Sequence, residues 1–518
     1  MRGILCTVTK AVLTICAAAT LSLNAATILP QGMNSTGGFR VRILNNIDAG
    51  LALQGSADLR SWTTIQENVP VTLDTTVTDN SAGAARQRFY RLAKPSPVVQ
   101  LPELATLPNQ VFTASEGFDT VQFAPSGALG MIVWKNQNLV YRERNTSGSW
   151  SEATISSSGR TFTAGSREEF RFQPHAALLF NSVSQPVVIR YAGGASFVAH
   201  TRQANGAWAE QTIAAQNAGS DFVLFAASMG AGDKLHIAVV NSGDNPSVSY
   251  GSNKSGSWSW SRVAGIVGNP RRFLAQSYAP RYFGMAVDSR NKAHIVYTPE
   301  LEITFPTGYA KPYSKLGYAS DASGAWQTEI VMSPRDWSGD AGTGASIAIA
   351  PGDVPVVASW MVERADTGSS QESYLYYHVR GANGTWNKTM VVSSPQNYAA
   401  GDGPKGTGFA PYLRFDTNGR AHILFLDHAA EHFNESGQNE YAGNLRLASW
   451  NGSSWTTKTL VQQTNPLQGQ MVYPAFAVNG NEIAYLTLQR ATTWLADSWP
   501  RQNAISAYTM RFGTATAQ

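Results

Sequence analysis

Short apolar runs separated by polar turns occur along most of the chain, and this pattern predicts β-strands rather than helices. From about residue 109 onward, a hairpin with a polar turn recurs seven times, as in MAVDSRNKAHIVY and LRFDTNGRAHILFL. A strand, a turn and a Trp follow six of these hairpins, as in LGYASDASGAW. Long runs with a period of 3.6 residues are absent. Each hairpin followed by two more strands predicts one four-stranded blade. The chain is therefore expected to be all-β, with a seven-bladed β-propeller over residues 109–518.

The repeat resembles the sialidase-like and BNR-type propellers over about four-fifths of the chain. The turn at residues 321–326, DASGAW, is similar to the Asp-box of sialidases, but the full Ser-x-Asp-x-Gly-x-Thr-Trp motif and an Arg-Ile-Pro motif are absent. The resemblance therefore implies the fold and not sialidase activity. The last repeat, ISAYTMRF, lacks a following Gly-x-Trp strand, so we predict that the segment near Val111 supplies the missing outer strand and closes the ring.

The first 26 residues have the layout of a secretory signal peptide. Arg2 and Lys10 precede an apolar run at 11–23, and small residues follow at 24–26. Cleavage is therefore expected near Ala25 or Ala26. A lipoprotein signal ending at Cys16 is the alternative. No later segment is long and apolar enough to span a bilayer. We expect a secreted protein, extracellular or periplasmic, without a membrane span.

Residues 27–95 are expected to form a separate small β-sandwich-like module. The motifs SADLRSW and RFYRL resemble a small module often attached to secreted bacterial proteins, which implies a spacing or attachment role. The Pro-rich stretch at 96–108 suits an interdomain linker. The mature chain of about 490 residues is longer than a single hydrophobic core usually serves, so more than one domain is expected.

Composition narrows the classes of ligand. Charged residues make up 14% of the chain, and the formal net charge of +4 falls to +2 without Arg2 and Lys10, so no nucleic-acid partner is expected. Both cysteines, Cys6 and Cys16, lie in the predicted leader, which leaves no disulfide or thiol chemistry. Secretion, low charge and 10% aromatic residues favour a polysaccharide or other glycan as the ligand. We expect a monomer without a cofactor.

Residues that recur at the same position in several blades are expected to be scaffold. One Trp recurs at the same turn position in six repeats, where it would pack between blades: Trp150, Trp208, Trp258, Trp326, Trp386 and Trp455. His236, His294 and His422 share one position on second strands. Sugar stacking is the alternative for the Trp set. A catalytic residue need occur only once, so repetition favours a structural role.

The stretch LFLDHAAEHFNESGQ, residues 424–438, breaks the repeat. Its His428, Glu431 and His432 fit H-x-x-E-H, the inverted zinc-protease pattern. Aligning second strands places Asp427 at a strand end and makes 428–440 a loop at the channel mouth. Because the zinc-protease pattern requires a helix, we expect a site cluster without metal or a solvated polar loop. A looser metal site at Asp427, His428 and His432 remains as a third alternative.

A second signal comes from prolines that begin several innermost strands. They stand in Pro174-His175, Pro280-Arg281, Pro411-Tyr412 and Pro474-Ala475. A shared register would place His175, Arg281 and Tyr412 at one level of the channel mouth. A polysaccharide lyase needs Arg against a uronate carboxylate, and His or Tyr for proton transfer. These three, with Asp427 and His428, are the candidate catalytic residues; the alternative is that they only fill the mouth.

A glycoside hydrolase would instead need two carboxylates across the site. Residues on the long connections are the candidates for substrate binding: Arg171, Arg272, Tyr278, Glu300, Tyr309, Trp337, Glu363, Glu431 and Trp494. The sequence thus predicts a carbohydrate-active propeller that cleaves a polysaccharide, as a lyase or a hydrolase. A non-catalytic lectin or adhesion propeller is the alternative. Because lectin propellers usually repeat one pocket, the unlike connections favour an enzyme.

Overall fold

The structure of the chain is a computed structural model. The described residues are 6–9, 27–33, 39–44, 51–58, 63–69, 75–79, 87–93, 121–135, 138–156, 176–215, 222–268, 283–300, 303–304, 310–311, 315–333, 340–364, 371–396, 407–433, 439–461, 471–494 and 503–516. The chain divides into two compact units, residues 1–98 and 99–518. Among the described residues, no helix is long and apolar enough to cross a membrane.

The first unit consists of two antiparallel sheets that share a core. One sheet has the order β2 (Thr27–Met33), β3 (Phe39–Leu44), β6 (Thr75–Asp79). The other has the order β1 (Cys6–Thr9), β7 (Gln87–Ala93), β4 (Leu51–Ser56), β5 (Thr63–Val69). Buried Phe39, Val41 and Leu53 come from both sheets, and Tyr90 stacks on Phe39. Strand β1 lies within the predicted leader, whose removal stays a prediction.

The described strands of the second unit form seven larger antiparallel sheets, which we number in chain order. Sheet 1 contains β8 (Val121–Phe123), β9 (Leu129–Lys135), β10 (Asn138–Arg144) and β11 (Trp150–Ser156). Sheet 2 contains β12 (Ala176–Phe180), β13 (Pro186–Gly193), β14 (Ser196–Arg202) and β15 (Trp208–Ala214). Sheet 3 contains β16 (Phe222–Gly230), β17 (Lys234–Asn241), β18 (Ser247–Ser252) and β19 (Ser259–Gly265).

Sheet 4 contains β20 (Gly284–Val287), β21 (Ala293–Tyr297), β24 (Leu316–Ser320) and β25 (Gln327–Met332), with a small pair, β22 (Ile303–Thr304) and β23 (Ala310–Lys311), between its second and third strands. Sheet 5 contains β26 (Asp340–Ala350), β27 (Val354–Arg364), β28 (Gln371–Arg380) and β29 (Trp386–Gln396). Sheet 6 contains β30 (Phe409–Phe415), β31 (Ala421–Phe433), β32 (Asn439–Trp450) and β33 (Trp455–Val461). Sheet 7 contains β34 (Met471–Asn479), β35 (Glu482–Trp494) and β36 (Asn503–Thr516).

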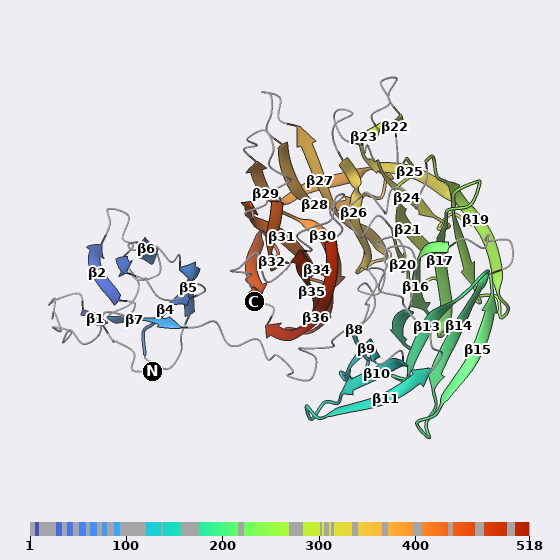
Figure 1. Cartoon of the computed structure of the whole chain (residues 1–518), viewed down its shortest axis with the longest axis horizontal. Helices are drawn as coiled ribbons and strands as arrows, with labels where there is room; N and C mark the ends of the chain where they lie inside the picture. The colour runs from blue at the N-terminus through green and yellow to red at the C-terminus, as the bar shows by residue number, and fades with distance from the viewer. Residues whose placement is uncertain are drawn as a thin grey trace. The chain divides into compact units, whose positions relative to one another are not determined.

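The first strands of these sheets neighbour one another in a ring. Strands β8, β12, β16, β20, β26, β30 and β34 are neighbours in that order, and β34 also neighbours β8 (Figure 1). Within each sheet the strands pair in sequence order. The second unit is a β-propeller. This arrangement confirms the predicted all-β propeller fold, with four strands described in sheets 1 to 6 and three in sheet 7. The segment near Val111, predicted to complete sheet 7, lies outside the described residues.

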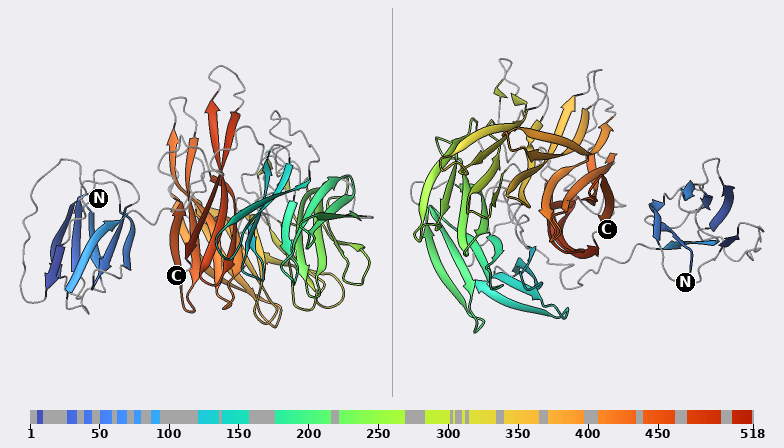
Figure 2. Two further views of the ribbon diagram at one scale, coloured as in Figure 1. Left: turned by 90° about the horizontal axis from the view of Figure 1, so that it is seen from below. Right: turned by 180° about the vertical axis from the view of Figure 1, so that it is seen from behind.

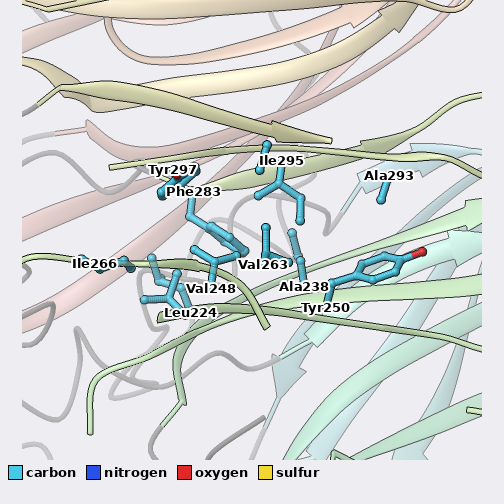
Figure 3. Close-up of a cluster of buried hydrophobic side chains, with 13 residues drawn as sticks. Leu224, Ala238, Val248, Tyr250, Val263, Ile266, Phe283, Ala293, Ile295 and Tyr297 are labelled. Atoms are coloured by element: carbon cyan, nitrogen blue, oxygen red, sulfur yellow. The ribbon is translucent and has the colours of Figure 1, made fainter. Parts of the chain in front are cut away.

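The core consists of apolar layers between neighbouring sheets. Leu224 and Val248 of sheet 3 face Phe283 and Ile295 of sheet 4 in one such layer (Figure 3). Alternate residues of each strand serve the two neighbouring layers, because successive side chains point to opposite faces of a sheet. Ile295 is fully buried, and burial of such a side chain stabilises the fold by roughly 1.5–3 kcal/mol.

The repeated Trp residues pack between sheets, as predicted. In four cases the Trp ring meets the edge of a Tyr from the preceding sheet, with ring centroids 5.1–5.7 Å apart: Trp208 on Tyr141, Trp326 on Tyr250, Trp386 on Tyr318 and Trp455 on Tyr377. Edge-to-face aromatic pairs of this kind add about 0.5–1.5 kcal/mol each beyond area burial.

The repeated His residues are also buried scaffold. His236 Nδ1 lies 2.6 Å from Tyr250 Oη, and His294 Nδ1 lies 2.5 Å from Tyr318 Oη. His422 occupies the same position in sheet 6, with Nδ1 2.9 Å from Ser449 Oγ. Each hydrogen bond stays within one sheet and links its second and third strands. The predicted structural role of these three residues is confirmed.

The two ends of the propeller differ. At one end lie tight turns between first and second strands and between third and fourth strands, such as 288–292 and 321–324. In an antiparallel sheet, the other connections lie at the opposite end. There the strand pairs β27–β28, β31–β32 and β35–β36 extend furthest (Figure 2). We call the end that bears these longer connections the rim.

Candidate functional site

Two ion pairs mark the described part of the rim, one in sheet 6 and one in sheet 4. Arg446 Nη1 donates to Asp427 Oδ2 at 2.8 Å, and Lys315 Nζ donates to Glu300 Oε1 at 2.9 Å. All four side chains are partly exposed, between 18% and 33%. Asp427 and Glu300 are two of the residues that the sequence singled out. We call these the sheet 6 rim pair and the sheet 4 rim pair.

The sheet 6 rim pair joins three strands. Asp427 lies on β31 and Arg446 on β32, and Arg446 Nη2 also donates to Thr457 Oγ1 on β33 at 2.8 Å. The guanidinium lies over the ring of buried Phe425, 5.7 Å from its centroid. Hydrogen bonds on both sides hold the planar guanidinium in one orientation, so the Asp427 carboxylate has a defined position.

The sheet 4 rim pair lies where two sheets are tied together. Val267, just after β19 of sheet 3, forms a parallel bridge with Glu300, and its N–H donates to the Pro299 carbonyl at 2.8 Å. Glu300 lies three residues after β21, and Lys315 lies just before β24. The pair therefore closes the base of the segment that contains β22 and β23.

The segment predicted as a loop at 428–440 is largely strand, so that prediction is wrong. Strand β31 continues to Phe433, and β32 begins at Asn439, with His432 opposite Glu440. The stretch extends the sheet as a hairpin beyond the propeller core. Four residues along a strand span about 13 Å. His428 and His432 are therefore not arranged as on the helix that a zinc-protease pattern requires.

Tyr412 lies in a packed seam rather than on an open surface. Its ring is 3% exposed and meets the edge of Phe476 of sheet 7, with centroids 5.4 Å apart. The Arg414 guanidinium lies over the Tyr412 ring at 4.2 Å and hydrogen-bonds to its hydroxyl. These contacts fit the alternative in which Tyr412 fills space between sheets 6 and 7. A catalytic role would require that seam to open.

The shared register predicted for the Pro-x dipeptides can be followed in sheets 6 and 7. Tyr412 pairs with Leu424, and Ala475 pairs with Leu486 at the equivalent level. In both strands a bulge lies beside the proline. His175 and Arg281 lie outside the described residues, so their place at this level stays a prediction.

The remaining predicted residues divide into two groups. In the first group the backbone is described and the side chain is not: His428 and Glu431 on β31, Glu363 on β27 and Trp494 on β35. Seven predicted residues lie outside the described ranges: His175, Arg281, Arg171, Arg272, Tyr278, Tyr309 and Trp337. In the described part of the chain, no three His, Cys, Asp or Glu side chains gather as a metal site would require.

Sequence reasoning missed the cations that pair with the predicted residues. Arg446, Arg414 and Lys315 each contact a residue that had been singled out. A signal was present for Arg446. Its position on the third strand holds an uncharged residue in five other sheets: Val140, Val198, Ser249, Gly317 and Tyr376. Sheet 7 has Arg511 at this position, so comparison of the repeats position by position would have set sheets 6 and 7 apart from the other five.

No protein-family model matches the chain, and a comparison with curated proteins finds no match. Solved structures with a similar arrangement include an α-L-arabinanase from Penicillium chrysogenum in complex with arabinobiose, at 9% identity and a TM-score of 0.40, covering 67% of this chain and 93% of that one. A lectin from Aleuria aurantia has 15% identity and a TM-score of 0.35, covering 67% and 97%. The β-propeller domain of the Trilobed protease from Pyrococcus furiosus has 10% identity and a TM-score of 0.35, covering 75% and 98%. Similarities this low transfer no activity.

Proposed function

We propose that this chain is a secreted carbohydrate-active protein that binds and cleaves a polysaccharide at the rim of its propeller. The observation that carries the proposal is the contrast between the two ends. At the tight-turn end, turns and ion pairs repeat from sheet to sheet, as with Asp288–Arg290 and Asp416–Arg420, whereas the rim pairs of sheets 4 and 6 occupy unlike positions. Repeated features are needed for the ring, so the features that break the repeat are the candidates for chemistry.

The rim bears side chains of the kinds that cleavage of a glycan uses, which supports the proposal. A hydrolase needs two carboxylates, one to donate a proton and one to activate water or attack the sugar. Asp427 and Glu300 are the described candidates. A lyase needs a cation against a uronate carboxylate and a group that removes the adjacent proton. The described cations there, Arg446 and Lys315, are each paired with an acidic residue, so the described groups favour a hydrolase. The products distinguish the two reactions.

A lectin with one pocket per blade receives less support. Such a pocket would need the repeated aromatic rings to face sugar. In four of the six repeats the Trp ring instead meets a Tyr of the preceding sheet, as with Trp326 and Tyr250. The Trp386 indole N–H also donates to Glu329 at 2.8 Å. Scaffold contacts therefore occupy the residues that a repeated sugar site would use.

The test is a panel of neutral and anionic polysaccharides offered to the purified protein. We expect cleavage of at least one polymer, seen as new reducing ends for a hydrolase or as unsaturated-uronate absorbance for a lyase. Binding without either signal would leave a lectin and contradict the enzymatic proposal. No binding and no products across the panel would contradict the carbohydrate proposal as a whole. Recovery of the protein from culture medium or periplasm tests secretion.

A further inference from the structure

The ring provides an internal comparison for the sheet 6 rim pair. On the second strand of sheet 6, Asp427 lies three residues after Leu424, which pairs with the first strand. In each other sheet we count three residues from the second-strand residue that is equivalent to Leu424. The equivalent residues are Lys135, Ala192, Asn241, Pro299, Met361 and Gln489. Asp427 is the single acidic residue of this set. Sheet 7 has Arg511 at the level of Arg446 but Gln489 at the level of Asp427, so the acid–cation combination occurs in sheet 6 alone.

Asp427 lies at the rim end of the layer between sheets 5 and 6. Side chains alternate along a strand, so Asp427 shares its face of β31 with Ile423 and Phe425, which pack against sheet 5. Strand β30 begins at Phe409, which pairs with Leu426. From Asp427 onward, β31 has no first-strand partner among the described residues. A side chain at this point lies where the propeller core ends and the projecting hairpin begins.

The ion pair leaves one carboxylate oxygen available. Arg446 Nη1 engages Oδ2 of Asp427, whereas Oδ1 has no hydrogen-bond partner among the described residues. Arg446 uses Nη2 on Thr457 Oγ1 and thereby anchors the pair to the outer strand. An ionised carboxylate only accepts hydrogen bonds, so its free oxygen calls for a donor. The hydroxyl groups of a sugar are donors of the right kind.

We propose that Asp427 accepts hydrogen bonds from the hydroxyl groups of a bound sugar unit, and that Arg446 is the positioning residue that orients its carboxylate. This inference rests on the proposed function and adds to it a defined subsite. The unit bound there presents neutral hydroxyls, because a uronate carboxylate would be repelled by Asp427. Hydrogen bonds to a charged group are stronger than neutral ones, so their loss is expected to weaken binding about 10- to 100-fold.

The experiment compares Asp427→Asn, Arg446→Met and Arg446→Lys with the wild-type chain and with Arg380→Met. Arg380 also lies on a third strand and forms an ion pair with Glu329, Nε to Oε1 at 2.8 Å, in sheets 4 and 5 away from the rim pair. Arg380→Met is therefore a matched control for the loss of one Arg ion pair. Affinity electrophoresis or calorimetry with the bound polysaccharide gives Kd, and thermal unfolding of each variant gives Tm.

We expect Asp427→Asn and Arg446→Met to weaken binding about 10- to 100-fold, Arg446→Lys to recover part of the loss, and Arg380→Met to bind as the wild type does. Unchanged Kd in Asp427→Asn and Arg446→Met would overturn this inference while the proposed function stood. Equal weakening in Arg380→Met would also overturn it, because the loss would then follow stability. A wild-type chain that binds no polysaccharide would remove the proposed function and this subsite together.

Discussion

At the scale of single residues, the histidines show best what repetition reveals. Five of the eight lie buried in the propeller: His200, His236, His294, His378 and His422. The three that share a second-strand position were recognised as scaffold from the sequence alone. His200 and His378 share a third-strand position that holds Arg142, Gly251, Ala319 and Ala448 elsewhere, so no pattern marked them. Only the contacts in the folded ring reveal their burial.

Burial makes these histidines a source of acid sensitivity. Desolvation lowers the pKa of all five, to about 4 for His236 and about 3 for His378. The unfolded chain therefore takes up these protons first as the pH falls below about 6.5, the ordinary His pKa. Their contribution to stability is present above pH ~6.5 and declines as the pH falls towards the folded pKa values.

We predict that His378→Gln reduces this acid dependence. His378 is 1% exposed and its Nε2 lies 2.8 Å from Ser359 Oγ, a contact that the Gln amide can replace. Removing one such proton-uptake step should flatten the slope of unfolding free energy against pH by about 1.4 kcal/mol per pH unit below pH ~6. Urea unfolding at pH 6.0, 5.5, 5.0 and 4.5 measures the slope. Parallel curves for the variant and the wild type would contradict the assignment.

At the scale of elements, the hairpins were predictable because their short apolar runs, buried on both faces of the sheet, are separated by polar turns. The lengths of the strands were not. Strand β31 continues through HAAEHF to Phe433, beyond the layer of neighbouring sheets. A ribbon that projects past the core need not alternate apolar and polar residues, so its sequence looked like a loop. The starts of β30 and β34 were also missed, since each strand begins before its proline and a bulge there shifts the register by an amount that composition does not reveal.

The Trp layer between sheets gives a prediction at this scale. Trp386 packs on Tyr318 with centroids 5.1 Å apart and donates to Glu329. Trp386→Ala should lower the free energy of unfolding by about 2–4 kcal/mol, because it removes aromatic packing and leaves a cavity. Met390→Ala, on the same strand and 52% exposed, is the control and should change it by less than about 0.5 kcal/mol. Denaturant titration compares the two; similar losses would show that β29 is sensitive throughout.

At the scale of the whole propeller, closure of the ring joins the first and last sheets. Strands β34 and β8 are neighbours, and Arg144 of sheet 1 forms an ion pair with Glu482 of sheet 7. Three strands are described in sheet 7, in the order β34, β35, β36. An outer edge on β36 would leave backbone donors and acceptors unpaired. The segment near Val111 was predicted to cover that edge, and this stays a prediction.

Two truncated chains test the closure. One begins at Val99, where the second unit begins, and the other begins at Gly117, which removes Val111 and Phe112. If that segment completes sheet 7, the shorter chain should lose about 2–4 kcal/mol of unfolding free energy, the order expected for exposing one or two apolar side chains. It should also associate through its open edge at high concentration, as size-exclusion chromatography would show. The chain from Val99 is the control for removal of the first unit. Equal stability and equal elution of the two chains would mean that the ring closes through its inner strands and the Arg144–Glu482 contact without an added outer strand.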